Sequence, residues 1–227
     1  GCALDAASRG LSVALIEQRD LSSGTSSRSS KLFHGGLRYL EQFDFKLVME
    51  ALHERELIRQ KLAPHLVWPV PFLYPLSHRV WERAYVGTGI TFYEGLAAIG
   101  GNTLPRQWHL SRSELQRAFP SIKKDAFVGG IRYYDAGCDD ARYTIAVART
   151  ASALGARILT SARVEGFVRD GERVAGIEAV CHETGRRFTT TAQVVVNATG
   201  VWTDRVEAKV GDKTTDVTAS KGIHIVV

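Results

Sequence analysis

The opening segment, residues 1–17, places the strongest constraint on the fold. Gly1 to Ser8 is rich in small residues and leads through Arg9-Gly10 into the apolar run Leu11 to Glu17. A helix that ends at a glycine and continues directly into an apolar strand is typical of a βαβ unit. The alanines let such a helix pack closely on a sheet. The segment therefore predicts an α/β fold with a parallel sheet.

Glu17 closes the predicted strand. In dinucleotide-binding folds, an acid at the end of the second strand, about 20 residues after the Gly-rich turn, accepts hydrogen bonds from ribose hydroxyls. The alternative interpretation is a solvated acid at a strand end. Residue chemistry alone leaves both interpretations open.

The second half of the chain reads as a β region. Ala192 to Asn197 is apolar and predicts a buried strand that delivers Ala198-Thr199-Gly200 at its C-terminal end, where ligands sit in open α/β sheets. A small residue and a glycine there let the backbone approach a ligand, although by itself such a triplet is more often an ordinary turn. Four short strands precede it, at Arg157–Thr160, Val164–Arg169, Val174–Cys181 and Arg187–Thr191, with turns at Asp170-Gly171 and Thr184-Gly185.

Helix signals occupy the middle of the chain. Asp44 can cap a helix to about Leu62, and Ser111 with Glu114 forms a capping box before a short helix. Asp139 or Asp140 can cap a longer helix to about Leu154. Two further segments are a proline-rich stretch that reads as an extended edge, at Pro64–Pro75, and a packed or amphipathic helix, at Val80–Ile99.

A hydroxyl-rich loop, Ser22 to Ser30, runs into the segment Lys31 to Leu40. The loop alone could be a flexible linker. The segment that follows interleaves apolar anchors with cationic groups around a glycine pair, which is not typical of linkers. We select His34 as a functional candidate because the glycines beside it allow close backbone approach and Arg38 supplies a phosphate fork. His224 is a second candidate, for which the sequence leaves a structural and a functional role equally open.

Composition narrows the classes of partner. The chain has 227 residues and a formal charge of +5, which fits attraction to phosphates, an anionic membrane or nucleic acid without choosing among them. Three separated cysteines argue against a disulfide framework or structural zinc and favour a reducing, cytoplasmic setting. No motif with metal-ligand spacing and no run of about 18 apolar residues occurs, so neither a metal site nor a membrane span is expected.

Together these residues resemble the FAD-dependent glycerol-3-phosphate dehydrogenases, which are quinone-linked members of the D-amino-acid-oxidase-like flavoprotein superfamily. The block Thr25 to Leu40 carries most of the resemblance, because Ser-Ser-Lys-Leu-x-His-Gly-Gly-Leu-Arg-Tyr-Leu is typical of that family rather than of the superfamily. Further matches are Ala63–Leu66, Asp139–Arg142, Val196–Trp202 and Ser220–Val227.

The resemblance implies a glutathione-reductase-type, Rossmann-like FAD-binding domain with a β-meander, and part of a mixed substrate-covering cap domain. The FAD-binding parts would be about 1–63 and 139–205, and the cap parts about 64–138 and 206–227. The phosphate-binding GxGxxG of the family would lie just ahead of the chain, so that Gly1 and Ala3 are its tail. We therefore expect a fragment cut at both ends, with an incomplete pyrophosphate site.

The resemblance also implies an activity. The intact enzyme would oxidise sn-glycerol 3-phosphate to dihydroxyacetone phosphate by hydride transfer from C2 to flavin N5, pass the electrons to a quinone, and associate peripherally with the inner face of the cell membrane. Arg38 and Tyr39 would position the substrate, and His34 would lie near the flavin and the C2 hydroxyl as a candidate general base. The implied cofactor contacts are Gly1, Ala3, Glu17, Thr25, Ser26, Ser27, Lys31, Val164, Ala198, Thr199 and Gly200.

Three alternatives remain at this point. A flavin oxidase of the same fold would use oxygen in place of quinone, and a non-catalytic relative would keep the fold without the activity. A basic nucleic-acid-binding module is disfavoured because no RRM, KH or helix-turn-helix signature is present. The oligomeric state is open, with a homo-oligomer among the possibilities.

Overall fold

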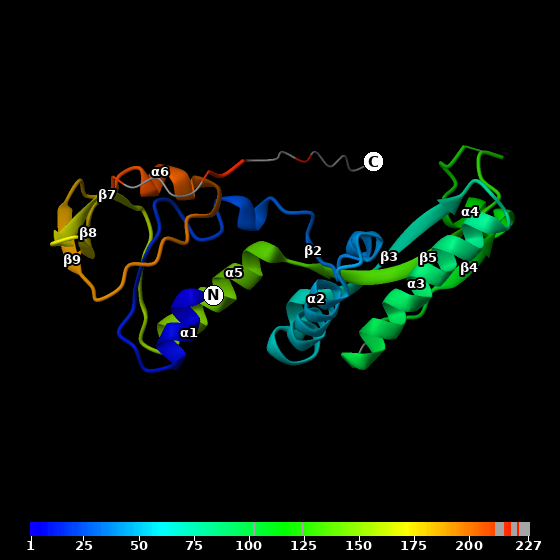
Figure 1. Ribbon diagram of the computed structural model, residues 1–227, viewed down its shortest axis with the longest axis horizontal. Helices are drawn as coiled ribbons and strands as arrows, with labels where there is room; N and C mark the ends of the chain where they lie inside the picture. Colours follow the sequence, from blue (N-terminus) through cyan, green and yellow to red (C-terminus); the bar gives the residue numbers. More distant parts are fainter. Residues whose placement is uncertain (102, 124, 212–215, 219–221, 223–227) are drawn as a thin grey trace. The chain divides into compact units, whose positions relative to one another are not determined.

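The computed structural model describes residues 1–101, 103–123, 125–211, 216–218 and 222, apart from the side chains of Arg38 and Glu41. The chain forms two compact units, each with its own core. Unit 1 comprises Gly1–Ser30 and Thr144–Val227, and unit 2 comprises Lys31–Tyr143. Helices occur with parallel and antiparallel strands, which confirms the predicted α/β class (Figure 1).

Unit 1 contains the predicted helix, glycine and parallel strand. Helix α1 (Cys2–Ser8) is followed by Gly10 in the left-handed region, with φ of +79°, and then by strand β1 (Ala14–Ile16). Strand β1 pairs in parallel with β6 (Arg157–Leu159). The chain enters unit 1 again through α5 (Asp140–Ala153). Small side chains from both helices pack with residues flanking the strands, and the core consists of Ala7, Ala151 and Ala156 with Leu4, Val13 and Ile158 around them.

An antiparallel meander completes the regular part of unit 1. Strands β7 (Ala162–Asp170), β8 (Arg173–Cys181) and β9 (Arg187–Thr191) are adjacent in chain order. The two predicted turns contain Gly171 and Gly185 at φ of +61° and +70°, conformations that glycine adopts without steric cost. The strand and turn predictions for this region are therefore confirmed.

The prediction of a buried strand at Ala192–Asn197 is wrong. After Ala192, whose N–H donates to the Ala175 carbonyl, the segment forms no ladder with any strand that the structure describes. Val194 and Val196 are 75% and 64% exposed. An apolar run becomes a buried strand only when a second strand hydrogen-bonds to its backbone and a further layer covers its side chains. The described residues supply no such second strand here.

Unit 2 is built on a four-stranded sheet around β5 (Gly129–Cys138). Strand β3 (Val67–Leu76) pairs with β5 along its whole length, and β2 (Leu32–Phe33) and β4 (Trp108–Ser111) pair with the two ends of β5 on its opposite edge. Three prolines lie in β3, which pairs with β5 alone among the described strands. Because proline has no N–H to donate to a ladder, it is tolerated at such an edge. The prediction of an extended edge is confirmed for Val67–Pro75 and is wrong for Pro64–Leu66, which forms the 3₁₀ helix η4.

Two long helices cover this sheet (Figure 1). Helix α2 (Phe45–Leu57) begins as predicted at Asp44, whose side chain accepts a hydrogen bond from the Leu47 N–H, and it continues as the π-helix η3 (Ile58–Leu62). Helix α3 (Trp81–Ile99) packs against α2 and the sheet. No helix in the described ranges is long and apolar enough to cross a membrane. The core residues are Val48, Leu52, Tyr93 and Ala97 between the helices, and Leu76, Ile90 and Ile131 against the sheet.

Two shorter predictions are also confirmed. Helix α4 (Arg112–Ala118) begins with the capping box of Ser111 and Glu114, in which each side chain satisfies a backbone N–H of the other residue. Helix α5 begins after Asp139, whose side chain accepts from the Arg142 N–H at 3.0 Å. Local side-chain capping therefore sets both helix starts, as the sequence indicated.

A buried ionic cluster links α2 to β5. Arg55 pairs with Glu56 at 3.1 Å and with Asp135 at 2.8 Å, and Arg59 pairs with Glu56 at 2.8 Å. Burial alone would raise the pKa of Glu56, but hydrogen bonds from Arg59 and Gln60 and the charges of both arginines outweigh it and hold that pKa below its ordinary value.

We predict that Glu56→Gln lowers the free energy of unfolding by about 3–5 kcal/mol near neutral pH, because it leaves a buried guanidinium short of a charge partner. Since the folded-state pKa of Glu56 is lowered, its contribution is complete above the unfolded-state pKa and is lost as the pH falls through the folded-state pKa. The difference from wild type should therefore shrink in acid. Denaturant unfolding across pH measures this.

Glu50→Gln on the same helix is the matched control. Glu50 lies 3.9 Å from Lys46 with both side chains largely exposed. An exposed pair of this kind contributes about 0.3–0.5 kcal/mol. Equal effects of the two substitutions at neutral pH would contradict the role given to the buried cluster.

Candidate functional site

In unit 1, Glu17 follows directly on the parallel pair β1 and β6. Its N–H donates to the Leu159 carbonyl at 2.8 Å and its carbonyl accepts from the Ala162 N–H at 3.0 Å. Its Oε1 accepts from the Arg19 N–H at 2.9 Å. The half-buried carboxylate therefore lies at the C-terminal end of parallel strands, the edge at which such folds bind their ligands.

Trp202 brings two predicted segments of unit 1 together. A Cβ placed on Gly24 would lie 3.1 Å from the Trp202 ring, so the hydroxyl-rich loop packs closely against the indole. The Arg19 guanidinium lies over the same ring, 5.5 Å from its centroid. Trp202 ends the 3₁₀ helix η5 (Gly200–Trp202), which begins in the predicted turn. The end of β1, the loop before the 3₁₀ helix η1 (Thr25–Ser27) and the turn at 198–200 are thus neighbours.

Asn197 shapes the turn at 198–200. Its Oδ1 accepts from the Thr199 hydroxyl at 2.7 Å and from the Thr199 N–H at 3.3 Å, and its Nδ2 donates to the Thr203 carbonyl at 3.2 Å. Gly200 follows with φ of +59°, and apart from Gly200 and its chain neighbours no atom of the described residues lies within 4 Å of where its Cβ would be. The turn therefore presents open backbone, with Ala198 and Thr199 exposed beside it.

The remaining unit 1 candidates lie on regular elements. Gly1 is the N-cap of α1, and Ala3 is in its first turn. Val164 pairs with Ala179 in the meander, next to a shift in register between Val164 and Gly166. Thr25 and Ser26 are exposed and Ser27 is half-buried. These positions leave the cofactor roles of all these residues as predictions.

In unit 2, the candidates follow one another between Lys31 and the 3₁₀ helix η2 (Leu37–Gln42). The Lys31 ammonium forms an ion pair with Asp140, and its carbonyl accepts from the Cys138 N–H at 2.8 Å. Lys31 has φ of +59°, in the left-handed region that few residues other than glycine adopt. The ion pair and the backbone contact therefore hold the start of the segment in an unusual conformation.

Both glycines of the His-Gly-Gly motif are buried and sterically required. A Cβ on Gly35 would lie 2.5 Å from the Tyr93 hydroxyl and 2.7 Å from Leu52 Cγ. Gly36 has φ of +73°, and a Cβ on it would lie 2.5 Å from the Tyr39 ring. The chain turns at this point because no side chain is present to prevent it.

The turn leaves His34 and Tyr39 accessible. His34 is exposed, and its imidazole has no hydrogen-bond partner within the described part of the chain. Tyr39 is 39% exposed and packs on Gly36. The backbone of Arg38 lies in η2, whereas its side chain, like His224, is outside the part of the chain that the structure describes. Lys31, His34, Arg38 and Tyr39 are therefore neighbours in one short segment.

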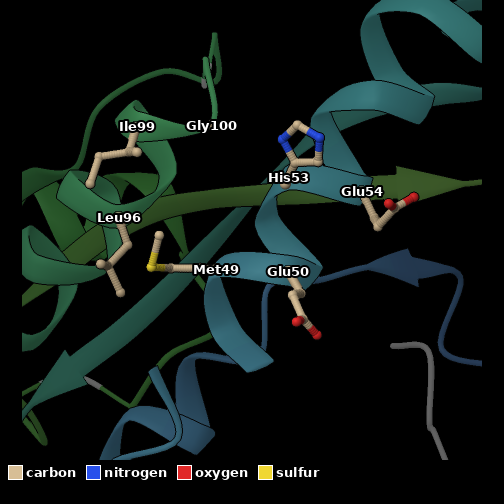
Figure 2. A pocket seen from close by; sticks show the side chains of 7 residues that line it. All are labelled: Met49, Glu50, His53, Glu54, Leu96, Ile99 and Gly100. Atoms are coloured by element: carbon tan, nitrogen blue, oxygen red, sulfur yellow. The ribbon is translucent and has the colours of Figure 1, made fainter. Parts of the chain in front are cut away.

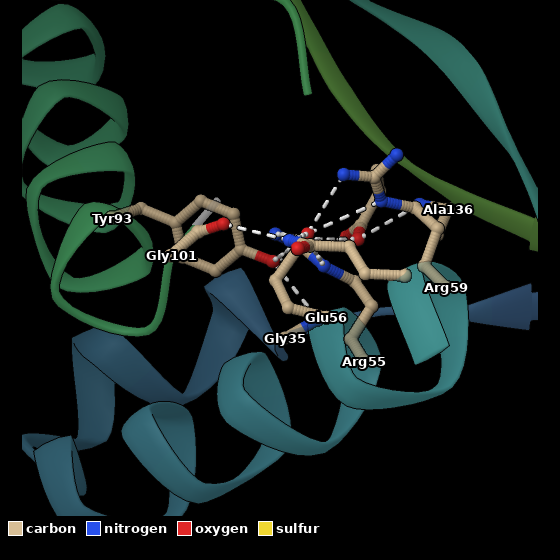
Figure 3. Close-up of polar contacts among 9 residues, drawn as sticks. Gly35, Arg55, Glu56, Arg59, Tyr93, Gly101 and Ala136 are labelled. Carbon is tan, nitrogen blue, oxygen red and sulfur yellow. Dashed lines mark hydrogen bonds and ion pairs between the residues drawn. The ribbon is translucent and has the colours of Figure 1, made fainter. Parts of the chain in front are cut away.

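Three residues behind this turn were not anticipated from sequence. Tyr93 hydrogen-bonds to the Gly35 N–H at 2.9 Å, and Asp135 and Arg55 complete the contact from β5 and α2 (Figure 3). Burial, and then the charge of Asp135, raise the pKa of Tyr93, so its hydroxyl keeps its proton. In the sequence Tyr93 resembles a core aromatic of an amphipathic helix, and nothing beside it indicates a polar role.

A pocket of about 310 Å³ lies elsewhere in unit 2 (Figure 2). It opens between α2 and α3, and the residues that line it are Met49, Glu50, His53, Glu54, Leu96, Ile99 and Gly100. None of the predicted site residues lines it. Over the described ranges, no three His, Cys, Asp or Glu side chains are grouped so as to hold a metal ion.

Comparison with known proteins identifies the family. The sequence matches the FAD dependent oxidoreductase family over residues 1–227. The chain belongs to this family. The Tyr93 contacts and the packing of Arg19 on Trp202 are thus features of a member of the FAD dependent oxidoreductase family.

Individual relatives agree with this assignment. The chain is 54% identical over 228 residues to a glycerol-3-phosphate dehydrogenase of Mycobacterium leprae, covering 100% of this chain and 39% of the relative. It is 41% identical over 242 residues to the mitochondrial glycerol-3-phosphate dehydrogenase of Bos taurus, covering 100% of this chain and 33% of that protein. The chain therefore spans well under half the length of these relatives.

A solved structure is similar as well. The glycerol-3-phosphate dehydrogenase of Bacillus halodurans, complexed with FAD, is 30% identical and superimposes with a TM-score of 0.66. The match covers 92% of this chain and 33% of that structure.

We predict that Gly35→Ala lowers the free energy of unfolding by about 1–3 kcal/mol, because the added methyl group overlaps a buried hydroxyl and a buried leucine. Gly89→Ala in α3 is the control: nothing lies within 4 Å of its Cβ position, so it should stabilise the helix by about 0.5–1 kcal/mol. Denaturant titration measures both. A Gly35→Ala protein as stable as wild type would show that the turn has room for a side chain.

Proposed function

We propose that the intact protein binds FAD and oxidises sn-glycerol 3-phosphate to dihydroxyacetone phosphate. The observation that carries the proposal is the 54% identity, across the whole of this chain, to a protein named glycerol-3-phosphate dehydrogenase. The exposed His34 and Tyr39 on a sterically defined turn support it, because the substrate hydroxyl needs a proton-accepting group and a hydrogen-bonding group held in place beside it.

The residues of unit 1 fit a dinucleotide. Glu17 has a second carboxylate oxygen beyond the one that holds the Arg19 N–H, and a carboxylate at this edge suits ribose hydroxyls. The exposed hydroxyls of Thr25 and Ser26 and the open backbone at Gly200 suit a pyrophosphate that must approach the main chain. We propose that Gly1, Ala3, Ser27, Val164, Ala198 and Thr199 complete the contacts from unit 1, and that Lys31 of unit 2 also contacts the cofactor. When bound, the flavin supplies the hydride acceptor.

The residues of unit 2 perform the remaining steps. Arg38 binds the substrate phosphate through its planar pair of N–H donors, and Tyr39 orients the substrate beside it. Oxidation of a secondary alcohol removes a hydride from C2 and a proton from the C2 hydroxyl. His34 takes that proton, since its exposed imidazole has no competing partner among the described residues.

We predict that glycerol 3-phosphate bleaches the flavin absorbance of the anaerobic intact protein, and that Arg38→Ala lowers the second-order rate constant about 10- to 150-fold. This range corresponds to the loss of one charged hydrogen-bonding interaction, about 1.5–3 kcal/mol. Stopped-flow absorbance measures both.

Arg117→Ala, which removes an exposed arginine in α4, serves as the control. Glycerol 3-phosphate should reduce its flavin with the same second-order rate constant as in wild type. A bound flavin that glycerol 3-phosphate does not reduce would exclude this substrate.

We propose further that the electrons pass to a quinone, and that the intact enzyme associates peripherally with the inner face of the membrane in which that quinone dissolves. The relatives are named dehydrogenases, which supports an acceptor other than oxygen.

The prediction is that substrate-reduced protein is reoxidised faster by a soluble quinone analogue than by dissolved oxygen at equal concentration. The flavin absorbance is followed after anaerobic reduction and mixing. Faster reoxidation by oxygen, with one hydrogen peroxide released per turnover, would make the protein an oxidase.

A further inference from the structure

One chain of hydrogen bonds connects the interior of unit 2 to the backbone of the His-Gly-Gly turn (Figure 3). The Gly35 N–H lies 2.9 Å from the Tyr93 hydroxyl, which lies 3.1 Å from Asp135 Oδ2. Asp135 Oδ1 accepts from Arg55 Nη1 at 2.8 Å and from the Ala136 N–H at 3.1 Å. Tyr93, Arg55 and Asp135 are at most 4% exposed.

The direction of each bond in this chain is determined by chemistry. A backbone N–H can only donate, so the Tyr93 oxygen accepts from Gly35. The Tyr93 proton must therefore point to Asp135, whose carboxylate accepts from Arg55 as well. Burial and the nearby carboxylate keep the pKa of Tyr93 above its ordinary value, so the phenol stays protonated and continues to donate to Asp135 at working pH. A buried chain with all of its donors and acceptors matched is rigid.

The groups of this hydrogen-bond chain come from three different elements of unit 2. Tyr93 comes from α3, Asp135 from β5 and Arg55 from α2, so the phenol that holds the Gly35 amide is itself held by groups from two other elements. That amide follows His34 directly and precedes the helix η2 that carries Arg38 and Tyr39. The same hydroxyl lies 2.5 Å from where a Gly35 Cβ would be. It both anchors the turn and restricts the position to glycine.

We propose that Tyr93, held by Asp135 and Arg55, is a positioning residue that sets where His34 and the start of η2 lie for the reaction. The inference rests on the proposed function for its catalytic consequence. Groups that transfer protons and bind substrate must be held within about 0.5 Å of the productive geometry. A small displacement of this backbone therefore slows the chemistry without removing a group that touches the substrate.

The test compares Tyr93→Phe with Tyr133→Phe in the FAD-loaded intact protein. Tyr133 is the matched control because it is a half-buried tyrosine whose pKa is also raised by burial and by Asp135, yet its ring stacks on Phe72 instead of reaching the turn. The first readout is the rate constant of flavin reduction at saturating glycerol 3-phosphate, per bound flavin, well below the unfolding temperature of each variant.

We expect Tyr93→Phe to lower this rate constant at least tenfold and Tyr133→Phe to leave it within twofold of wild type. In a His34→Ala background, Tyr93→Phe should lower the rate constant by a smaller factor than in wild type, because the part of its effect that acts through His34 is gone and only the part that acts through η2 remains. An unchanged rate constant per bound flavin, with only a lower melting temperature, would overturn the proposal and leave Tyr93 a purely stabilising residue.

The second readout does not depend on substrate. Hydrogen exchange of peptides covering residues 32–42 should accelerate in Tyr93→Phe and not in Tyr133→Phe, because only the former removes the acceptor of the Gly35 N–H. Acceleration spread evenly over unit 2 would overturn the positioning role. If glycerol 3-phosphate fails to reduce even the wild-type flavin, the proposed function falls, and the exchange pattern still decides whether Tyr93 holds the turn.

Discussion

The ion pair between Arg55 and Asp135 is the interaction on which unit 2 depends. A guanidinium that leaves water must be fully paired, and here two carboxylates and a phenol surround it. Pairing the Arg55 guanidinium requires α2, α3 and β5 to meet in one arrangement. The His-Gly-Gly turn packs on the Tyr93 hydroxyl that belongs to this cluster. A uniquely satisfied polar cluster specifies one geometry where apolar packing alone would tolerate several.

Unit 1 organises its candidate residues differently, through contacts near the surface. Asn197 folds the turn at 198–200 with its own side chain, and Trp202 covers Gly24 while Arg19 stacks on the indole. These contacts leave hydroxyls and open backbone exposed and the Glu17 carboxylate half-buried, which suits a large polar cofactor. The rigid buried cluster of unit 2 suits a residue that must be held in place, such as His34 in the role proposed for it.

Local signals in the sequence predicted local structure well. The caps at Asp44, Ser111 and Asp139 act within three residues of the backbone groups they satisfy, and the glycine turns of the meander need no distant partner. The predicted strand at 192–197 failed because a strand needs a neighbour, and apolar residues alone do not supply one. Contacts of Tyr93 with Gly35 and of Arg55 with Asp135 join residues 58 and 80 positions apart, beyond any periodicity.

The sequence by itself determined the family, the α/β class and the segment from Lys31 to Leu40 as a candidate site, because those depend on residue identity and short spacing. Only the tertiary structure decided why Gly35 must be glycine and which residues hold His34 in place. Those answers depend on where a phenol from α3 and a carboxylate from β5 meet the turn. The folded chain alone brings these groups within hydrogen-bond distance, since nothing between them in the sequence requires it.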